Sequence, residues 1–143
     1  MSRVDFHILE NPQPEQALRY ACRLINKAYM QGHRLYVRVA DAGNAEQLDR
    51  MLWAFSDLAF VPHRIEGSGD ATPVPVNIGI MGEASEADAI LVNLCSDMPG
   101  RYARHERVIE IVAGDAEATK AARSRYRQYR EHGDVLNTHK ISS

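Results

Sequence analysis

The sequence predicts an α/β domain built on a largely parallel sheet. Short apolar segments alternate along the chain with longer segments of helical periodicity, which is typical of consecutive βαβ units. One of these segments, DAILVNL at residues 88–94, is apolar enough for a buried central strand of such a sheet. A chain of 143 residues is most simply one compact domain, so we expect a single domain over residues 1–143.

Two strand–helix units are predicted in the N-terminal part. Residues 3–9 (RVDFHIL) form the first strand, and residues 11–32 form a helix with a proline in its first turn and a glycine at its end. Alternating apolar residues over 34–40 (RLYVRVA) predict the second strand. Residues 44–55 (NAEQLDRMLWAF) follow as the second helix, because apolar side chains recur there at helical spacing.

Three further strands are predicted after these units. Residues 59–65 (AFVPHRI) indicate a short third strand whose proline suits an edge or a strand end. A loop over 66–73 leads to another strand, VPVNIGI at 74–80. The segment ERVIEIV at 106–112 predicts one more strand after the central one.

A helix and a short tail are predicted at the C-terminal end. Asp115 is suited to cap the start of the last helix, and Gly133 can close that helix in a left-handed turn. The tail NTHKISS, residues 137–143, is expected to fray.

Composition and charge restrict the class of protein. No apolar run approaches the roughly 18 residues of a membrane span, so we expect no membrane partner. Cys22 and Cys95 lie in apolar segments and predict buried thiols and a cytoplasmic location. Residues 1–100 contain 8 Lys and Arg against 13 Asp and Glu, whereas residues 101–143 contain 9 against 6. The basic C-terminal third could therefore recognise an acidic partner, while bulk affinity for nucleic acid is doubtful.

Motifs for nucleotide, metal or covalent chemistry are missing. Gly67 and Gly69 have no third glycine, and no phosphate-loop motif occurs in the chain. The six histidines and two cysteines have no metal-ligand spacing, and there is no nucleophile elbow. His63 is expected to be a structural or surface histidine. We therefore expect no reaction, no metal and no cofactor.

The only tryptophan occupies an unusual position on the second predicted helix. Its core stripe is formed by Leu48, Met51, Leu52 and Phe55. Trp53 points about 120° away from this stripe, in the same sector as Glu46 and Asp49. Trp53 either packs under a neighbouring segment or forms, together with Phe60, a contact with another protein.

The segment AARSRYRQYREHG, residues 121–133, contains four arginines and two tyrosines. Helical spacing places Arg123, Arg127 and Arg130 on the solvent face and Tyr129 on the packed face, with Tyr126 between the two faces. This surface suits an acidic peptide that carries an apolar residue or a terminal carboxylate. It also suits single-stranded nucleic acid, and a plain solvated helix face is a third interpretation.

Two stretches of the sequence resemble the chi subunits of bacterial DNA polymerase III. They are LDRMLWAFSDLAFVPHRIEGSG followed by PVPVNIG, and ARSRYRQYREHGDVLNTHK, and the similarity covers nearly the whole chain. The resemblance implies a Rossmann-like three-layer domain with a largely parallel sheet flanked by helices and no functional nucleotide site. It also implies a non-catalytic accessory subunit of the clamp-loader complex.

The resemblance further implies two protein partners in DNA replication and only an indirect link to DNA. One partner is the psi subunit, for which Trp53 and Phe60 match the binding positions. The other is the acidic C-terminal tail of single-stranded DNA-binding protein, which ends in phenylalanine. A direct single-stranded nucleic-acid-binding module and a nucleotide-dependent α/β enzyme remain alternatives.

The resemblance also assigns the residues that would hold the acidic tail. Arg123 would pair with the terminal carboxylate, Tyr126 and Val112 would hold the phenylalanine ring, and the tail's aspartates would be drawn in by Lys120, Arg127 and Arg130. Some members of the family have a basic residue one turn before this arginine, where this chain has Thr119 with Lys120 beside it. Ala113 and Gly114 are smaller than expected behind Val112.

Overall fold

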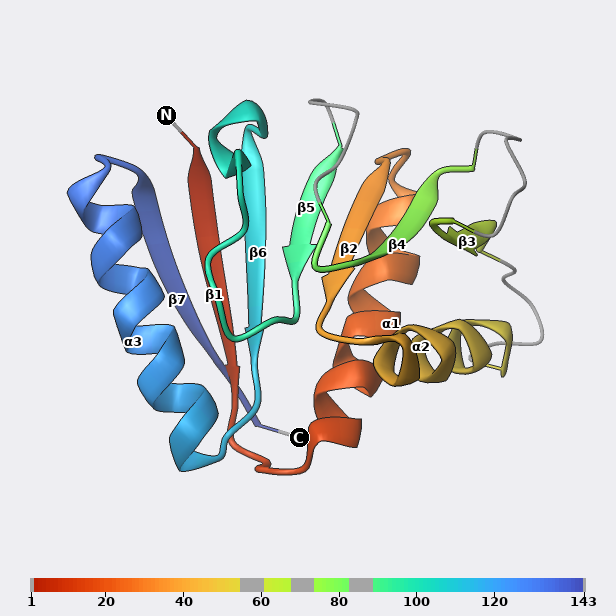
Figure 1. Ribbon diagram of the computed structural model, residues 1–143, viewed down its shortest axis with the longest axis horizontal. Helices are drawn as coiled ribbons and strands as arrows, with labels where there is room; N and C mark the ends of the chain where they lie inside the picture. The colour runs from red at the N-terminus through yellow and green to blue at the C-terminus, as the bar shows by residue number, and fades with distance from the viewer. Residues whose placement is uncertain (1, 55–60, 68–73, 83–88, 143) are drawn as a thin grey trace.

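The computed structural model describes residues 2–54, 61–67, 74–82 and 89–142 and shows a seven-stranded sheet with helices on both faces (Figure 1). The strand order is β3-β4-β2-β5-β6-β1-β7, and every described strand pairing is parallel. The predicted α/β fold class, a Rossmann-like three-layer domain, is thereby confirmed.

The elements follow the predicted order closely. The strands are β1 (Arg3–Leu9), β2 (Leu35–Val39), β3 (His63–Ile65), β4 (Val76–Ile80), β5 (Ile90–Asn93), β6 (Arg107–Val112) and β7 (Val135–Ile141). The helices are α1 (Pro14–Met30), α2 (Ala42–Ala54), the short 3-10 helix η1 (Tyr102–Arg104) and α3 (Ala116–Glu131). None of the helices in the described ranges is both long and apolar enough to cross a membrane.

The helices divide between the two faces of the sheet. Helices α1 and α2 pack on one face, where they share a core with Leu9, Val37 and Ile109 of the strands. Helix α3 packs on the other face, against β1, β6 and β7 at one end of the sheet (Figure 1). The buried core of this second face includes Phe6 of β1 and Tyr129 of α3.

Local sequence signals set the ends of α3. The Asp115 carboxylate accepts a hydrogen bond from the backbone N–H of Ala118 at 3.1 Å, as predicted for an N-cap residue. At the other end Gly133 has a φ of 83°, in the left-handed region that glycine adopts without a steric penalty. Both predictions about this helix are confirmed.

The prediction that the C-terminal tail frays is wrong. Residues 135–141 form β7, which pairs in parallel with β1 over its whole length. Four consecutive polar residues, Asn137, Thr138, His139 and Lys140, leave no apolar alternation that would predict the strand, because an edge strand leaves most of its side chains exposed. Ile141 and Leu136 pack against the cores of the first and second face, respectively.

Candidate functional site

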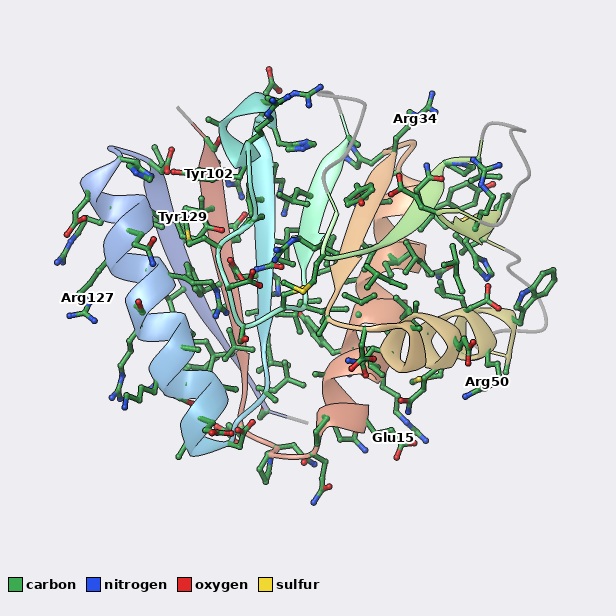
Figure 2. All side chains as sticks on the ribbon, viewed as in Figure 1. Glu15, Arg34, Arg50, Tyr102, Arg127 and Tyr129 are labelled. Carbon is green, nitrogen blue, oxygen red and sulfur yellow. The ribbon has the colours of Figure 1, made fainter. Side chains whose placement is uncertain are left out.

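Helix α3 carries four exposed cations, which are Lys120, Arg123, Arg127 and Arg130. Arg127 points away from the sheet in Figure 2. Among the described residues, no hydrogen-bond or ion-pair partner is found for any of the four. The predicted solvent face of α3 is confirmed, and its charged groups are available to an anionic ligand.

Tyr126 lies between this exposed face and the core, as predicted. Its side chain is half-buried, and its ring centroid is 5.5 Å from that of Phe6 on β1. The ring therefore has one side in the core of the second face and an edge near the exposed cations. Arg123 is three residues before Tyr126 on the same flank of α3, so an apolar surface and a guanidinium group are neighbours there.

Val112 joins the same core but is almost fully covered. Its side chain is only 2% exposed at the end of β6, so it can form the floor beneath a ligand but not an open wall. Gly114, two residues after Val112, is small for a local structural reason. A Cβ atom on Gly114 would lie 2.4 Å from the backbone oxygen of Glu10, so only glycine fits where the chain crosses the end of β1.

The structure adds a basic residue to this flank that the sequence did not predict. Ile8 of β1 is in register with Val112 of β6 on one side and with Lys140 of β7 on the other. Residues in register point to the same face of a sheet, so Lys140 is on the α3 face, at its outer edge. Thr119 cannot supply a charge, and its hydroxyl donates to the backbone oxygen of Asp115. No local signal in residues 135–141 could have located Lys140, because its position depends on the register of β7 with β1.

Arg125 belongs to the same run of arginines but points into the protein. It is 3% exposed, its Nε lies 3.2 Å from Oε1 of Glu110, and its Nη1 donates to the backbone oxygen of Ser96 at 2.7 Å. The buried Glu110 carboxylate also accepts hydrogen bonds from the Tyr129 hydroxyl at 2.7 Å and from the Asn93 amide at 3.0 Å. Burial raises the pKa of Glu110, and the nearby Arg125 guanidinium opposes that rise. These contacts fix α3 against β5, β6 and the segment after β5.

The second predicted contact surface lies on α2. Trp53 is 60% exposed, which confirms that it points away from the apolar stripe by which α2 packs on the sheet. Its ring centroid is 5.4 Å from that of His63, whose Nε2 is 3.0 Å from Oδ1 of Asp49. His63 therefore has the expected structural position beneath the indole, connecting α2 to β3. Phe60 lies outside the described residues.

The two surfaces are far apart on the sheet. Helix α3 covers the β6-β1-β7 end, whereas α2 contacts β2, β3 and β4 near the opposite edge (Figure 1). A partner on one helix would therefore leave the other accessible.

The turn between β1 and α1 is where a dinucleotide-binding domain of this class carries its glycine-rich loop. Here that turn reads Glu10, Asn11, Pro12 and Gln13. Within the described ranges, no group of three or more His, Cys, Asp or Glu residues could hold a metal ion.

Comparison with known proteins identifies the family of the chain. Residues 1–137 match the family model described as "DNA polymerase III chi subunit, HolC". A Pseudomonas aeruginosa protein named DNA polymerase III subunit chi is 35% identical over 141 residues, which cover 99% of this chain and 98% of the relative. Proteins of the same name from Escherichia coli and Haemophilus influenzae are 28% and 26% identical, over 96% and 95% of this chain and 97% and 95% of their own lengths. The chain belongs to the DNA polymerase III chi subunit family.

Proposed function

We propose that this protein is a non-catalytic accessory subunit of the replicative polymerase that connects two other proteins. One would be the psi subunit of the clamp-loader complex, bound at Trp53 and Phe60. The other would be the acidic C-terminal tail of single-stranded DNA-binding protein, bound on α3. The observation that carries this proposal is the set of exposed, unpaired cations beside the half-buried ring of Tyr126.

The tail site would combine a charged clamp with an apolar platform. Arg123 would donate two parallel hydrogen bonds to the terminal carboxylate, since guanidinium and carboxylate groups match in this geometry. The last phenyl ring of the tail would pack on Tyr126, above the floor formed by Val112. The tail's preceding aspartates would lie near Lys120, Arg127 and Arg130.

Lys140 would add a further positive charge from β7, the edge strand on the face of the sheet that α3 covers. Exposed charges of this kind mainly accelerate association and are weakened by salt. The apolar platform and the Arg123 clamp would set the lifetime of the complex.

The psi surface would use an aromatic anchor. Tryptophan is enriched among the residues that dominate binding energy at protein interfaces. The Trp53 indole is exposed, and the buried His63 ring supports it from below. A rigid exposed indole loses little side-chain entropy when a partner covers it.

Binding of a labelled tail peptide, followed by fluorescence anisotropy, tests the tail site. Arg123→Ala should weaken the peptide at least tenfold, which corresponds to ~1.4 kcal/mol or more. Arg19→Ala, an exposed arginine on α1, is the matched control and should leave affinity unchanged. A peptide that lacks its final phenylalanine should bind much more weakly to the unaltered protein.

The psi surface is tested separately by the same reasoning. Trp53→Ala should reduce the amount of psi subunit recovered in a pull-down, and it should leave the affinity for the tail peptide unchanged. Unchanged peptide binding in Arg123→Ala would remove the clamp from the proposal, and unchanged psi binding in Trp53→Ala would remove the anchor. Loss of both partners in one variant, together with a lowered melting temperature, would indicate unfolding.

A further inference from the structure

A hollow of about 520 Å³ lies on the face of the sheet opposite α3, between α1 and the strands β1 and β6. We call it the basic hollow and define it by His7, Tyr20, Arg23, Lys27 and Arg107. Tyr20, Arg23 and Lys27 lie on one flank of α1 because they follow one another at helical spacing. His7 and Arg107 rise from the sheet floor.

The charge of the basic hollow is positive although the protein as a whole is slightly acidic. Its described lining includes Arg23, Lys27 and Arg107 and no aspartate or glutamate. Beside the hollow, the Asp5 carboxylate is 1% exposed and lies 3.4 Å from Nε of Arg107, 3.3 Å from Nε of Arg3 and 3.6 Å from Nε2 of His139. One buried carboxylate thus pairs with two partly exposed arginines and can neutralise only one positive charge. Arg23 and Lys27 add further positive charge to the hollow.

His7 is half-buried on the floor of the basic hollow. Burial and the nearby His139 lower the pKa of His7, and Arg107 lowers it further, while Asp5 has the opposite effect. The Arg107 guanidinium is thus close enough to His7 to act on its ring.

Flat rings extend from the basic hollow toward the sheet edge. The ring centroids of Tyr20 and His7 are 5.5 Å apart, and those of His7 and His139 are 5.0 Å apart. The Arg23 guanidinium lies 5.7 Å from the Tyr20 ring centroid. A row of rings flanked by cations is how proteins hold single-stranded nucleic acid without sequence preference, through base stacking and phosphate contacts.

We propose that the basic hollow and the adjacent row of rings bind single-stranded DNA. Arg23, Lys27 and Arg107 would contact phosphates, and Tyr20 would stack against a base. The chain belongs to a family of DNA polymerase subunits, so the template strand is a ligand such a protein would meet. This site is separate from the surfaces on α3 and α2, and gives the protein a direct contact with DNA besides the indirect one through its partners.

Fluorescence anisotropy with the full chain and a labelled single-stranded oligonucleotide of roughly 16 nucleotides tests the proposal. The double variant Arg23→Glu/Lys27→Glu should bind at least tenfold more weakly at low salt. Its plot of log affinity against log salt should be shallower by about 1.4, because two phosphate contacts are lost at about 0.7 each. The matched control, Arg50→Glu/Arg104→Glu, changes the net charge equally at two exposed arginines outside the hollow and should keep its affinity for the oligonucleotide.

The outcomes separate this proposal from the α3 site. Absence of oligonucleotide binding at low salt would overturn it, and so would equal losses in the two double variants, which would indicate a mere net-charge effect. A duplex of equal length that binds as well as the single strand would show that unpaired bases are not held, and would also refute it. If Arg23→Glu/Lys27→Glu no longer bound the acidic tail peptide but still bound the oligonucleotide, the hollow would be a peptide site and the proposal would be refuted. Melting temperatures close to that of the unaltered protein would show that the variants fold.

Discussion

Replacing Arg125 with methionine tests whether the buried ion pair holds α3 in place. The Arg125 and Glu110 side chains are 4% and 0% exposed, and their closest atoms are 3.2 Å apart. Methionine keeps much of the length and the apolar stem of arginine but removes the charge and the hydrogen bond to Ser96. The substitution leaves the Glu110 carboxylate with only Tyr129 and Asn93 as donors.

The expected loss of stability follows from the pKa of the stranded carboxylate. An ordinary glutamate has a pKa of 4.5, and burial already raises that of Glu110. Without Arg125, the carboxyl group can escape its desolvation cost by binding a proton at pH 7. Protonating the carboxyl group costs about 1.36 kcal/mol for each pH unit above 4.5. At pH 7 the loss of stability from the stranded carboxylate therefore cannot exceed ~3.4 kcal/mol. The lost hydrogen bond adds about 1 kcal/mol, so we expect a destabilisation of about 3–4 kcal/mol, as for other broken buried pairs.

The same reasoning fixes the pH dependence. The carboxyl group in the folded variant has a raised pKa, so the folded state binds more protons than the unfolded state above pH 4.5. The destabilisation is therefore smallest below that pH and grows as the pH rises. Between pH 7 and pH 5 the destabilisation should fall by up to about 2.7 kcal/mol. The additional change Glu110→Gln should abolish this pH dependence, since glutamine does not ionise.

Urea unfolding followed by circular dichroism measures these differences. Arg127→Met is the matched control, because it is the same change on the same helix at an exposed position, and it should cost less than about 0.5 kcal/mol. A loss for Arg125→Met within 0.5 kcal/mol of that control, or an equal loss at pH 5 and pH 7, would show that the pair does not anchor α3.

Three further predictions concern the rest of the fold. Burial raises the pKa of Cys22 to about 12 and that of Cys95 to about 11, so both thiols should react with a disulfide reagent at pH 8 only after unfolding; rapid labelling of the folded protein would contradict this. A hydrogen bond from Arg38 lowers the pKa of Asp97 below its ordinary 3.8. The unaltered protein should therefore be more stable than Asp97→Asn at pH 6, and this difference should disappear as the pH falls below 3.8. An equal difference in urea melts at pH 3 and pH 6 would contradict this. Deleting residues 135–143 removes β7 and uncovers the edge of β1, so the truncated chain should lose its cooperative thermal transition, and an unchanged melting curve would show that β7 is dispensable.

Much of the fold was predictable because its signals are local. The strands β1, β2, β4, β5 and β6 alternate or are continuously apolar, and α3 has an aspartate at its N-cap and a glycine after its end. These signals depend on neighbours a few residues apart, so the sequence displays them directly. The exposed position of Trp53 followed from helical geometry for the same reason.

The features that were missed depend on contacts between distant residues. Strand β7 exists because β1 offers it an unpaired edge more than 120 residues away, and its own polar residues give little sign of it. Lys140 joins the α3 flank only through the register of β7 with β1 and β6. Likewise the ion pair of Arg125 with Glu110 links a helix to a strand. Pairings of this kind are set by tertiary structure, which local propensity does not encode.

The run of arginines on α3 can serve two purposes because of the helical repeat. Residues two positions apart on a helix point about 200° apart, so Arg125 enters the protein where Arg123 and Arg127 leave it. The buried guanidinium has a carboxylate supplied by β6, and the exposed ones therefore need no acidic neighbours to keep the helix in place. A helix whose anchoring charges are internal can present unpaired cations outside, and that separation is what an acidic ligand on α3 would require.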